Sequence, residues 1–345
     1  MTLTDLGGWP AVLGPLTAAR DLSPDQVTAA ITEILEGAAT PAQIAAFAVG
    51  LRMKGETVEE MSALLDAMRA FGEPVELAAG TDAVDTCGTG GDRACTINAS
   101  TVAALVVAGA GAKVCKHGNR SQTSQCGAAD LLEALGVTID LAPGAVAGCV
   151  DQVGMGFCFA PRYHPAFRHV GPVRRELGVA TVFNFLGPVA NPARVRRQVL
   201  GVSDPAMAAK LLGVLEAQGA ERALVVYGHD GLDELSTITT STVLELRDGE
   251  RRTYDVDPAA LGLKPATLEE IQGGDPATNA DLARRILDGE PGPRREFVLL
   301  NAAAGLVAAG MADDLGEGLA AATSSVDEGR AAGVLDRLVR VSAES

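Results

Sequence analysis

Apolar positions in the first 75 residues recur with the period of an α-helix. Three segments begin with Ser or Thr followed three residues later by Gln or Glu, and they start at Ser23, Thr40 and Thr57. This pattern satisfies free amides at the start of a helix. Apolar side chains at spacings of three and four follow each start. The pattern predicts a helical unit over residues 1–75, and the segment 72–80 is expected to be a linker.

From residue 82 onward, short apolar runs alternate with longer helical patterns, which is typical of an α/β sheet with parallel strands. We predict strands near 83–86, 113–115, 156–159, 197–202 and 223–227. We predict helices near 99–109, 127–135, 206–218, 278–288 and 295–309. Two segments around Asp248-Gly249 predict a peripheral β-hairpin. The expected fold is a small all-helical N-terminal domain plus a larger α/β domain, residues 76–345, with a central, mostly parallel sheet flanked by helices.

Composition limits the possible partners and the compartment. The formal charge of −16 argues against a broad nucleic-acid or anionic-membrane surface, because such partners are bound by clustered Lys and Arg. The six cysteines show no C-x-x-C pair, so they are expected to be packing residues in a reducing compartment. The N-terminus has no basic region followed by an apolar run, and no stretch reaches transmembrane length. We therefore expect a soluble cytoplasmic protein.

The densest candidate chemistry begins where the first predicted strand ends. Residues 85–92 read DTCGTGGD, and these glycines allow a tight turn that brings backbone N–H groups close to a ligand. Residues 98–101 then open an Ala/Val-rich helix, whose free amides face the same loop. Taken alone, the loop could equally be a structural turn, because it matches neither G-x-G-x-x-G nor the nucleotide P-loop.

Two further loops support a site for a polyanion and a metal. Residues 116–124, KHGNRSQTS, follow a strand and supply cationic and hydroxyl donors for phosphate oxygens. Residues 230–234, DGLDE, follow another strand, and Asp233 and Glu234 could hold Mg²⁺, although a turn with acidic helix-start residues explains this segment equally well. Because the carboxyl ends of parallel strands share one edge, these loops are expected to form one site.

The remaining candidates concern a carboxylate partner and a nucleophile. Arg174 or Arg175 could clamp a carboxylate bidentately if turned inward, and a solvated helix face is the alternative. His164 closes a predicted strand nearby. No G-x-S-x-G motif is present, and no cysteine has an obvious low-pKa setting beyond Cys115. The reaction is therefore expected to rely on positioning and charge stabilisation.

Eight ordered motifs together resemble the anthranilate phosphoribosyltransferase family, and the resemblance runs from the helical N-terminus to about Leu338. They are CGTGGD at 87–92, TINAST at 96–101, KHGNRS at 116–121, ADLLEALGV at 129–137, FAPRYHPA at 159–166, PVRRELG at 172–178, FNFLGPVANPA at 183–193 and DGLDE at 230–234. The resemblance implies transfer of a phosphoribosyl group from phosphoribosyl diphosphate to anthranilate in tryptophan biosynthesis, with Mg²⁺. It also implies a homodimer through the helical domains and a return of residues 165–185 to the helical domain.

The resemblance assigns roles residue by residue. Those expected to hold phosphoribosyl diphosphate are Gly88, Gly91, Asp92, Thr96, Asn98, Ala99, Ser100, Thr101, Lys116, His117, Gly118, Asn119, Arg120, Ser121, Gln122, Thr123, Ser124 and Ala128. Those expected to receive anthranilate are Gly88, His117, Asn119, His164, Arg174, Gly187 and Pro188. The metal ligands implied are Ser100, Asp233 and Glu234, bound directly or through water. Lys116 and Arg120 are expected to stabilise charge in the reaction.

Some positions depart from the family pattern. Arg93 replaces a usual glycine, Ala99 replaces a larger aliphatic residue, and Cys126 and Ala128 replace serines. These changes predict altered closure of the glycine loop, weaker donor binding or a shifted acceptor. The alternatives to be tested are a phosphoribosyltransferase acting on a related aromatic acceptor, a pyrimidine nucleoside phosphorylase, and a non-catalytic binding relative of the same fold.

Overall fold

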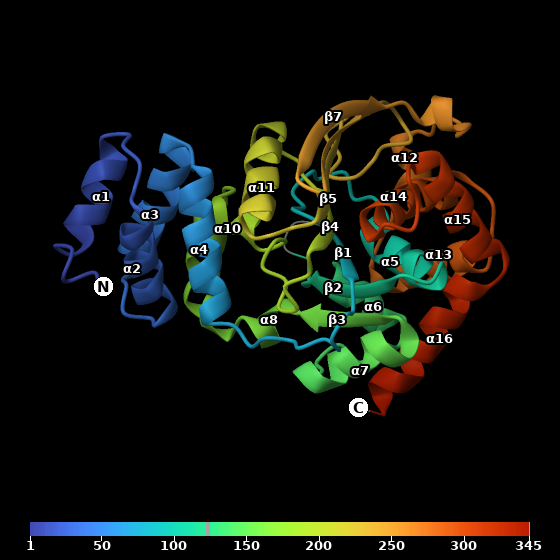
Figure 1. Cartoon of the computed structure of the whole chain (residues 1–345), viewed down its shortest axis with the longest axis horizontal. Coiled ribbons are helices and arrows are strands. Elements are labelled where there is room, and N and C mark those ends of the chain that lie inside the picture. The colour runs from blue at the N-terminus through green and yellow to red at the C-terminus, as the bar shows by residue number, and fades with distance from the viewer. Residues whose placement is uncertain (122–124, 345) are drawn as a thin grey trace.

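The computed structural model describes residues 1–121 and 125–344, and a seven-stranded sheet lies at its centre (Figure 1). The strands are β1 (Ala83–Gly88), β2 (Lys113–Gly118), β3 (Met155–Phe159), β4 (Arg197–Gly201), β5 (Arg222–Gly228), β6 (Ser241–Arg247) and β7 (Glu250–Val256). Their order is β3-β2-β1-β4-β5-β6-β7, with parallel pairing from β3 to β5 and antiparallel pairing of β5, β6 and β7. The predicted strands, the mostly parallel sheet and the peripheral hairpin are confirmed.

Both faces of the parallel strands are buried, as their continuous apolar runs require. On β5, Leu224 and Val226 belong to one hydrophobic core, whereas Ala223 and Val225 belong to the other. This alternation follows from the two-residue period of a strand. The sheet therefore separates two cores, one on each face.

Helices rich in Ala and Val cover the first face. Two of them, α5 (Ala99–Gly109) and α14 (Pro293–Ala309), pack against each other and against β1 (Figure 1). The other elements around the α/β part are α6 (Ala128–Ala134), α7 (Pro143–Val153), η2 (Pro258–Leu261), α12 (Leu268–Ile271), α13 (Pro276–Leu287), α15 (Leu315–Asp327) and α16 (Arg330–Ala343). Small side chains allow these helices to approach closely, so a core with few aromatic residues still packs densely.

The N-terminal unit consists of α1 (Trp9–Thr17), α2 (Pro24–Leu35), α3 (Pro41–Lys54) and α4 (Val58–Ala70). The three predicted helix starts are confirmed as complete capping boxes. Ser23, Thr40 and Thr57 each accept a hydrogen bond from the backbone N–H three residues later, and that residue's side chain accepts one in return.

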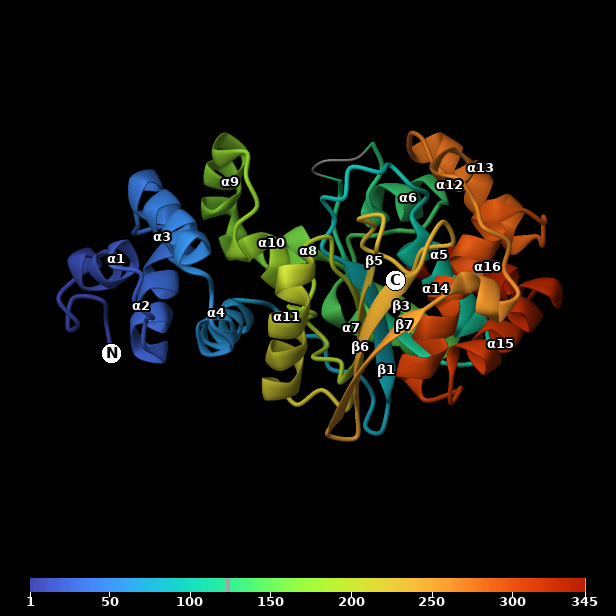
Figure 2. The ribbon, with the colours of Figure 1, turned by 90° about the horizontal axis from the view of Figure 1, so that it is seen from above.

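The second face of the sheet is covered by α11 (Pro205–Ala217), which lies between the sheet and the N-terminal helices (Figure 1). The segment between β3 and β4 contains α8 (Ala160–Tyr163), η1 (Pro165–His169), α9 (Gly171–Leu177) and α10 (Val182–Leu186). Helix α9 contacts α3, and α10 contacts α3 and α4 (Figure 2). One hydrophobic core thus runs from the N-terminal helices through α9, α10 and α11 to the sheet.

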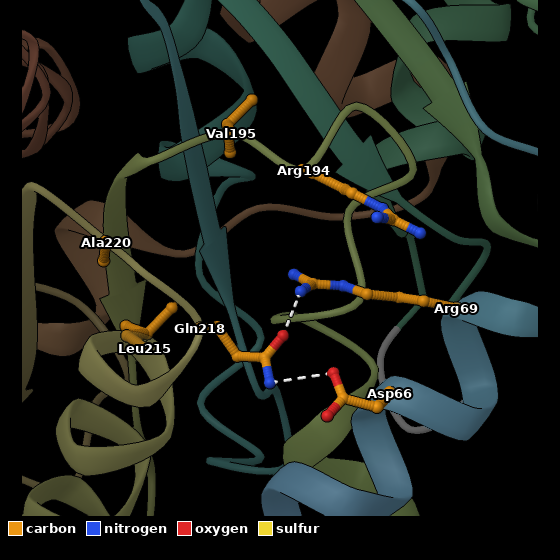
Figure 3. A pocket seen from close by; sticks show the side chains of 7 residues that line it. All are labelled: Asp66, Arg69, Arg194, Val195, Leu215, Gln218 and Ala220. Atoms are coloured by element: carbon orange, nitrogen blue, oxygen red, sulfur yellow. Dashed lines mark hydrogen bonds between the residues drawn. The ribbon is translucent and has the colours of Figure 1, made fainter.

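Hydrogen bonds between polar side chains join α4 to Gln218, the residue that follows α11 (Figure 3). The Arg69 guanidinium donates to the Gln218 side chain and, over 2.9 Å, to the Val189 carbonyl. Gln218 Nε2 in turn donates to Asp66 Oδ1 over 3.0 Å. The contact between the helical and α/β parts is therefore specified by hydrogen bonds as well as by apolar packing.

The sequence predictions did not include α1, α7, α15 and α16. Helix α7 carries an apolar stripe at Val146, Cys149, Val150 and Val153, and α16 carries one at Val334, Leu335 and Leu338, so the helical period could have indicated both. In the ranges 1–121 and 125–344, no helix has the length and apolar character needed to cross the hydrocarbon core of a bilayer.

A glycine in α15 provides a test of the close helix packing. A Cβ at Gly318 would lie 2.7 Å from the Ala303 carbonyl oxygen of α14, so Gly318→Ala should lower the free energy of unfolding by about 1–3 kcal/mol. The matched control is Gly148→Ala in α7, where a Cβ would lie 3.6 Å from Nε2 of the flexible Gln152 side chain. That change should stabilise the protein by about 0.5–1 kcal/mol. Urea unfolding would measure both, and equal effects would contradict the prediction.

Candidate active site

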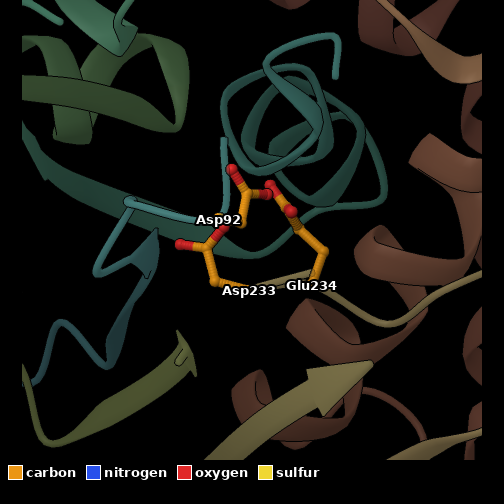
Figure 4. A group of neighbouring side chains, drawn as sticks. All are labelled: Asp92, Asp233 and Glu234. Atoms are coloured by element: carbon orange, nitrogen blue, oxygen red, sulfur yellow. The ribbon is translucent and has the colours of Figure 1, made fainter. Parts of the chain in front are cut away.

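Three carboxylates meet where the loops after β1 and β5 cross the edge of the sheet (Figure 4). Oxygens of Asp92, Asp233 and Glu234 all lie within 4.8 Å of one another. The sequence predicted Asp233 and Glu234 as metal ligands but assigned Asp92 only to the sugar diphosphate. Its position as the last residue of the GTGGD turn was the available signal, and only the fold brings it to the other two acids.

Two glycines allow Asp233 to reach this position. A Cβ at Gly201 would lie 1.5 Å from the Asp233 carbonyl oxygen, and one at Gly88 would lie 2.3 Å from Asp233 Oδ2. The Gly90 N–H donates to the same Oδ2 over 2.6 Å. The acidic loop therefore lies directly on the ends of β1 and β4, where any larger residue would displace it.

Burial and mutual repulsion raise the pKa values of these carboxylates. Burial is the main cause that raises the pKa of Asp233 to about 6, and the Asp92 charge adds to it. The same two effects, with Asp233 as the neighbour, raise the pKa of Glu234 well above its usual value. Glu234 Oε2 is buried without a hydrogen-bond partner in the described ranges. Oxygen-rich clusters of this kind suit a hard divalent cation.

Lys116 is a buried cation whose charge acts on Glu234 of this cluster. Its ammonium donates to the Thr86 carbonyl and, over 3.4 Å, to Ser100 Oγ. Burial lowers the pKa of Lys116, while the charges of Asp85 and Glu234 oppose that shift. Lys116 therefore joins β2, the end of β1 and the start of α5. Ser100 lies beside Lys116, and its predicted role as a metal ligand stays a prediction.

Asp85 of β1 fixes the position of β2, the strand that carries Lys116. Asp85 was assigned no role from the sequence. Its Oδ1 accepts from the His117 N–H over 3.2 Å, and its Oδ2 accepts from Asn191 Nδ2 over 2.8 Å. The same Asn191 amide donates to the Cys115 carbonyl over 2.8 Å. Burial raises the pKa of Asp85 to about 6, and Lys116 opposes the shift. Together these contacts fix Lys116 and His117 relative to β1.

The start of α5 lies at the same edge of the sheet and has no side-chain cap. Asn98 occupies the N-cap position but makes no side-chain cap hydrogen bond, because its Oδ1 accepts from Asn279 Nδ2 over 2.9 Å while its Nδ2 donates to the Cys126 carbonyl over 2.9 Å. Thr96 pairs with Gln272 just before it. Ala99 and Thr101 are buried in the first turn, and Thr101 Oγ1 has no partner in the part of the chain described. An uncapped helix start of this kind is a favourable position for an anion.

The loop after β2 is organised by Asp130 of α6. Asp130 Oδ2 accepts from the N–H groups of Ser121 and Gly127 over 3.0 and 2.9 Å. Asn119 accepts the Ala129 N–H, and Ala128 packs against Gly118. Arg120 forms ion pairs with Asp130 and Glu133 over 2.9 and 2.8 Å, so its guanidinium is not joined to the carboxylate cluster. Its predicted charge-stabilising role stays a prediction. Gln122, Thr123 and Ser124 lie outside the described residues.

A pair of buried histidines lies on the other side of Lys116. The rings of His117 and His164 are 5.2 Å apart in an edge-to-face arrangement. His164 Nε2 lies 3.0 Å from the Ala190 carbonyl, and His117 hydrogen-bonds the Gly187 backbone. Burial lowers the pKa of both rings, most strongly for His117. His117 Nε2 and His164 Nδ1 have no partner in residues 1–121 and 125–344, so they are neutral rings with free acceptor nitrogens.

The neighbouring backbone is also fixed. The Pro188 carbonyl accepts from Gln198 Nε2 over 3.0 Å. Arg174 lies on α9, where burial lowers its pKa and leaves its Nε without a partner in the described chain. Within that part of the chain, no contact joins the Arg174 side chain to the histidine pair. Its predicted role toward a carboxylate therefore stays a prediction.

The glycine loop adopts backbone conformations that explain one departure from the family pattern. Gly90 and Gly91 have φ values of 65° and 88°, and Arg93 has a φ of 60°. This left-handed conformation is costly for a residue with a side chain and costs glycine almost nothing. Arg93 therefore keeps the turn of the loop at some expense in backbone strain.

Comparison with known proteins matches both parts of the chain to one family. Residues 10–72 match the family model described as "Glycosyl transferase family, helical bundle domain", and residues 80–332 match "Glycosyl transferase family, a/b domain". An anthranilate phosphoribosyltransferase of Roseiflexus castenholzii is 52% identical over 93% of this chain and 95% of its own length. One of Rhodococcus jostii is 51% identical over 95% of this chain and 92% of its own length.

Solved structures agree with this match. Anthranilate phosphoribosyltransferase from Thermus thermophilus is 41% identical, with a TM-score of 0.91 over 96% of this chain and 99% of that one. The Saccharomyces cerevisiae enzyme in complex with PRPP and Mg is 27% identical, with a TM-score of 0.89 over 98% of both chains. The same yeast enzyme has also been solved with 4-fluoroanthranilate, at 26% identity and a TM-score of 0.88 over 98% of both chains.

The carboxylate cluster predicts a pH-dependent response to divalent ions. Because the folded-state pKa of Asp233 is about 6 and its ordinary value is 3.8, the folded state holds this proton more tightly than the unfolded state does. Without divalent ions, stability should therefore fall as pH rises from about 4 through 6. Above pH 6 the ionised group can bind Mg²⁺ or Mn²⁺, so added ion should raise the Tm more at pH 7.5 than at pH 5.5.

Differential scanning fluorimetry with millimolar Mn²⁺ would measure this response, and Asp233→Asn is the control. The variant should lose most of the ion-dependent gain at pH 7.5. Equal Tm gains at the two pH values in the unmodified protein would contradict a site that must shed protons to bind metal.

Proposed function

Because this chain belongs to the anthranilate phosphoribosyltransferase family, we propose that it transfers the phosphoribosyl group of 5-phosphoribosyl 1-diphosphate to anthranilate and releases diphosphate. The observation that carries the proposal is the meeting, at one sheet edge, of the Asp92-Asp233-Glu234 cluster, buried Lys116 and the uncapped start of α5. Such an edge combines metal ligands with groups that attract a polyanion.

The donor would lie between the glycine loop and α5. Backbone N–H groups of the glycine loop after Gly90 and of the start of α5 would receive its phosphate oxygens, because a tight turn and a helix start present such groups to an anion. The Thr89 and Gly90 N–H groups are already bonded to the Gly201 carbonyl and to Asp233. Residues 116–121 would line the other side, and the family resemblance extends this role to Gln122, Thr123, Ser124 and Ala128. Lys116, held by Thr86 and Ser100, would face the leaving group.

The three carboxylates fit Mg²⁺, and we propose them as its ligands. They are close together, Asp233 is buried and the other two are half-buried, and Glu234 Oε2 lacks a partner in the described ranges, so their combined negative charge favours a cation. Mg²⁺, when bound with the donor, would neutralise charge on the departing diphosphate. Ser100 could act through water, as the family pattern implies.

The chain's own residues would stabilise charge and direct the acceptor. Breaking the bond between ribose C1 and the diphosphate oxygen leaves positive charge on the sugar and negative charge on the leaving group, and Lys116 with the loop amides would stabilise the latter. The amine of anthranilate is unprotonated near pH 7 and would attack C1 through its lone pair as the bond to the diphosphate breaks, and the proton then lost from the nitrogen would pass to the released diphosphate or to solvent. The free nitrogens of His117 and His164 would accept its N–H hydrogen bonds and align it.

The rest of the acceptor site follows from the resemblance. Arg174 would bind the carboxylate of anthranilate bidentately, and its half-buried side chain, whose Nε is buried without a partner among the described residues, supports that role. Gly88, Asn119, Gly187 and Pro188 would line the path of the ring. We also propose two domains, residues 76–345 without 165–185 and residues 1–75 with 165–185, and a homodimer through the helical domains. Light scattering should then give twice the mass of one chain.

A fluorescence assay tests the proposed reaction. Anthranilate fluorescence should fall only when protein, phosphoribosyl diphosphate and Mg²⁺ are all present, because anthranilate is consumed when its amine nitrogen bonds to C1 of the ribose. Released diphosphate should equal the anthranilate consumed. A stable fluorescence signal at saturating donor and Mg²⁺ would rule out this acceptor, and phosphorolysis of thymidine or uridine would support a nucleoside phosphorylase instead.

Two neighbouring arginines separate recognition of the acceptor from general surface charge. Arg174→Ala should raise the KM for anthranilate about 10- to 100-fold with a small change in kcat, because a charge-assisted hydrogen bond is lost. Arg175→Ala is the matched control, since Arg175 is the exposed neighbour on the same helix. Steady-state kinetics would decide, and similar KM values for the two variants would argue against a carboxylate role for Arg174.

A further inference from the structure

The loop that carries Asp233 and Glu234 is hydrogen-bonded to one buried side chain of α14, Asn301. Leu235 directly follows Asp233 and Glu234, and its N–H donates to Asn301 Oδ1 over 3.0 Å. The Leu235 carbonyl accepts from Asn301 Nδ2, also over 3.0 Å. A single amide therefore pairs with both backbone groups of the residue next to the acids.

Asn301 can do this because its own orientation is fixed. Its Nδ2 makes a further hydrogen bond to the Phe297 carbonyl, one turn earlier on α14, over 2.9 Å. Both N–H donors of the amide are thus used, and the side chain is buried. Leu235 is buried as well, so losing this amide would leave a backbone donor and acceptor without partners.

The other end of the loop is fixed by different contacts. Ser236 Oγ donates to Asp230 Oδ2 over 2.6 Å, and the Gly228 N–H donates to the Leu232 carbonyl over 2.9 Å. These bonds close the turn within the loop itself. Asn301 is different, because it ties the acidic residues to a core helix that also packs against α5 and β1.

We propose that Asn301 is a positioning residue for the metal site: it sets where Asp233 and Glu234 lie relative to Asp92 by fixing the backbone at Leu235. This inference rests on the proposed metal-dependent function. Asn301 touches neither the carboxylate oxygens nor a substrate, so its effect passes through the backbone. Residues that orient metal ligands in this way commonly change metal affinity by about 10- to 100-fold when they are replaced.

Direct ion binding tests the proposal independently of turnover. Mn²⁺ would be titrated into the full-length protein with phosphoribosyl diphosphate present, and free Mn²⁺ would be followed by its EPR signal. Asn301→Leu removes both hydrogen bonds to Leu235 at similar volume, and Asn301→Asp keeps an acceptor for the Leu235 N–H while losing the amide donor. Both variants should raise the Mn²⁺ concentration for half-saturation about tenfold or more.

The control is Ser342→Ala, which removes another buried side-chain bond to backbone, the 3.0 Å bond from the Thr138 N–H, far along the chain from the acids. It should lower the Tm without changing the Mn²⁺ half-saturation. Folded Asn301 variants that bind Mn²⁺ within twofold of the unmodified protein would overturn the proposal. If Asn301→Leu fails to fold, Asn301→Asp decides. An unmodified protein that binds no Mn²⁺ with the donor would overturn the proposed function itself, and this inference with it.

Discussion

The structure depends on placing three carboxylates and one ammonium together at a buried sheet edge. Burial alone opposes both charges: it raises the pKa of Asp233 and Glu234 and lowers the pKa of Lys116. Lys116 compensates for part of the negative charge, and its own charge is already shared with Asp85. The cluster retains net negative charge, so the folded chain is arranged to take up a cation together with a polyanion. A net negative charge at a buried site is tolerated only where the surrounding residues hold the charged groups in fixed positions.

That frame is made from elements far apart in the sequence. Gly88 and Gly201 let the acidic loop lie on the strand ends, Asp85 and Asn191 fix the strand bearing Lys116, and α14 carries Asn301. Apart from Gly88, which is also proposed to line the substrate site, none of these groups has an obvious chemical role in a phosphoribosyl transfer. Each fixes the position of a charged group that is proposed to take part in the reaction. The charges of the site are therefore oriented before a substrate binds.

Local patterns predicted much of this fold. The capping boxes at Ser23, Thr40 and Thr57 and the apolar strand at 223–227 depend on neighbouring residues, so sequence reasoning recovered them. The glycine loop and the DGLDE segment were recognisable for the same reason. The proximity of Asp92 to Glu234 was not, because 141 intervening residues must fold first. The pairing of Arg120 with Asp130 and Glu133 likewise depends on how α6 starts, and the histidine pair requires β2 and β3 to lie side by side.

The two ends of the site differ in charge for a chemical reason. At the proposed donor end, ionised groups gather where negative charge would grow on the leaving diphosphate as the bond to C1 breaks. The proposed acceptor end holds His117 and His164, whose pKa values are lowered by burial and whose Nε2 and Nδ1, respectively, have no partner among the described residues. A protonated ring there would offer only donors to an amine that needs acceptors for its N–H groups. Burial keeps both rings neutral, so the same low-polarity surroundings that strengthen charge at one end preserve hydrogen-bond acceptors at the other.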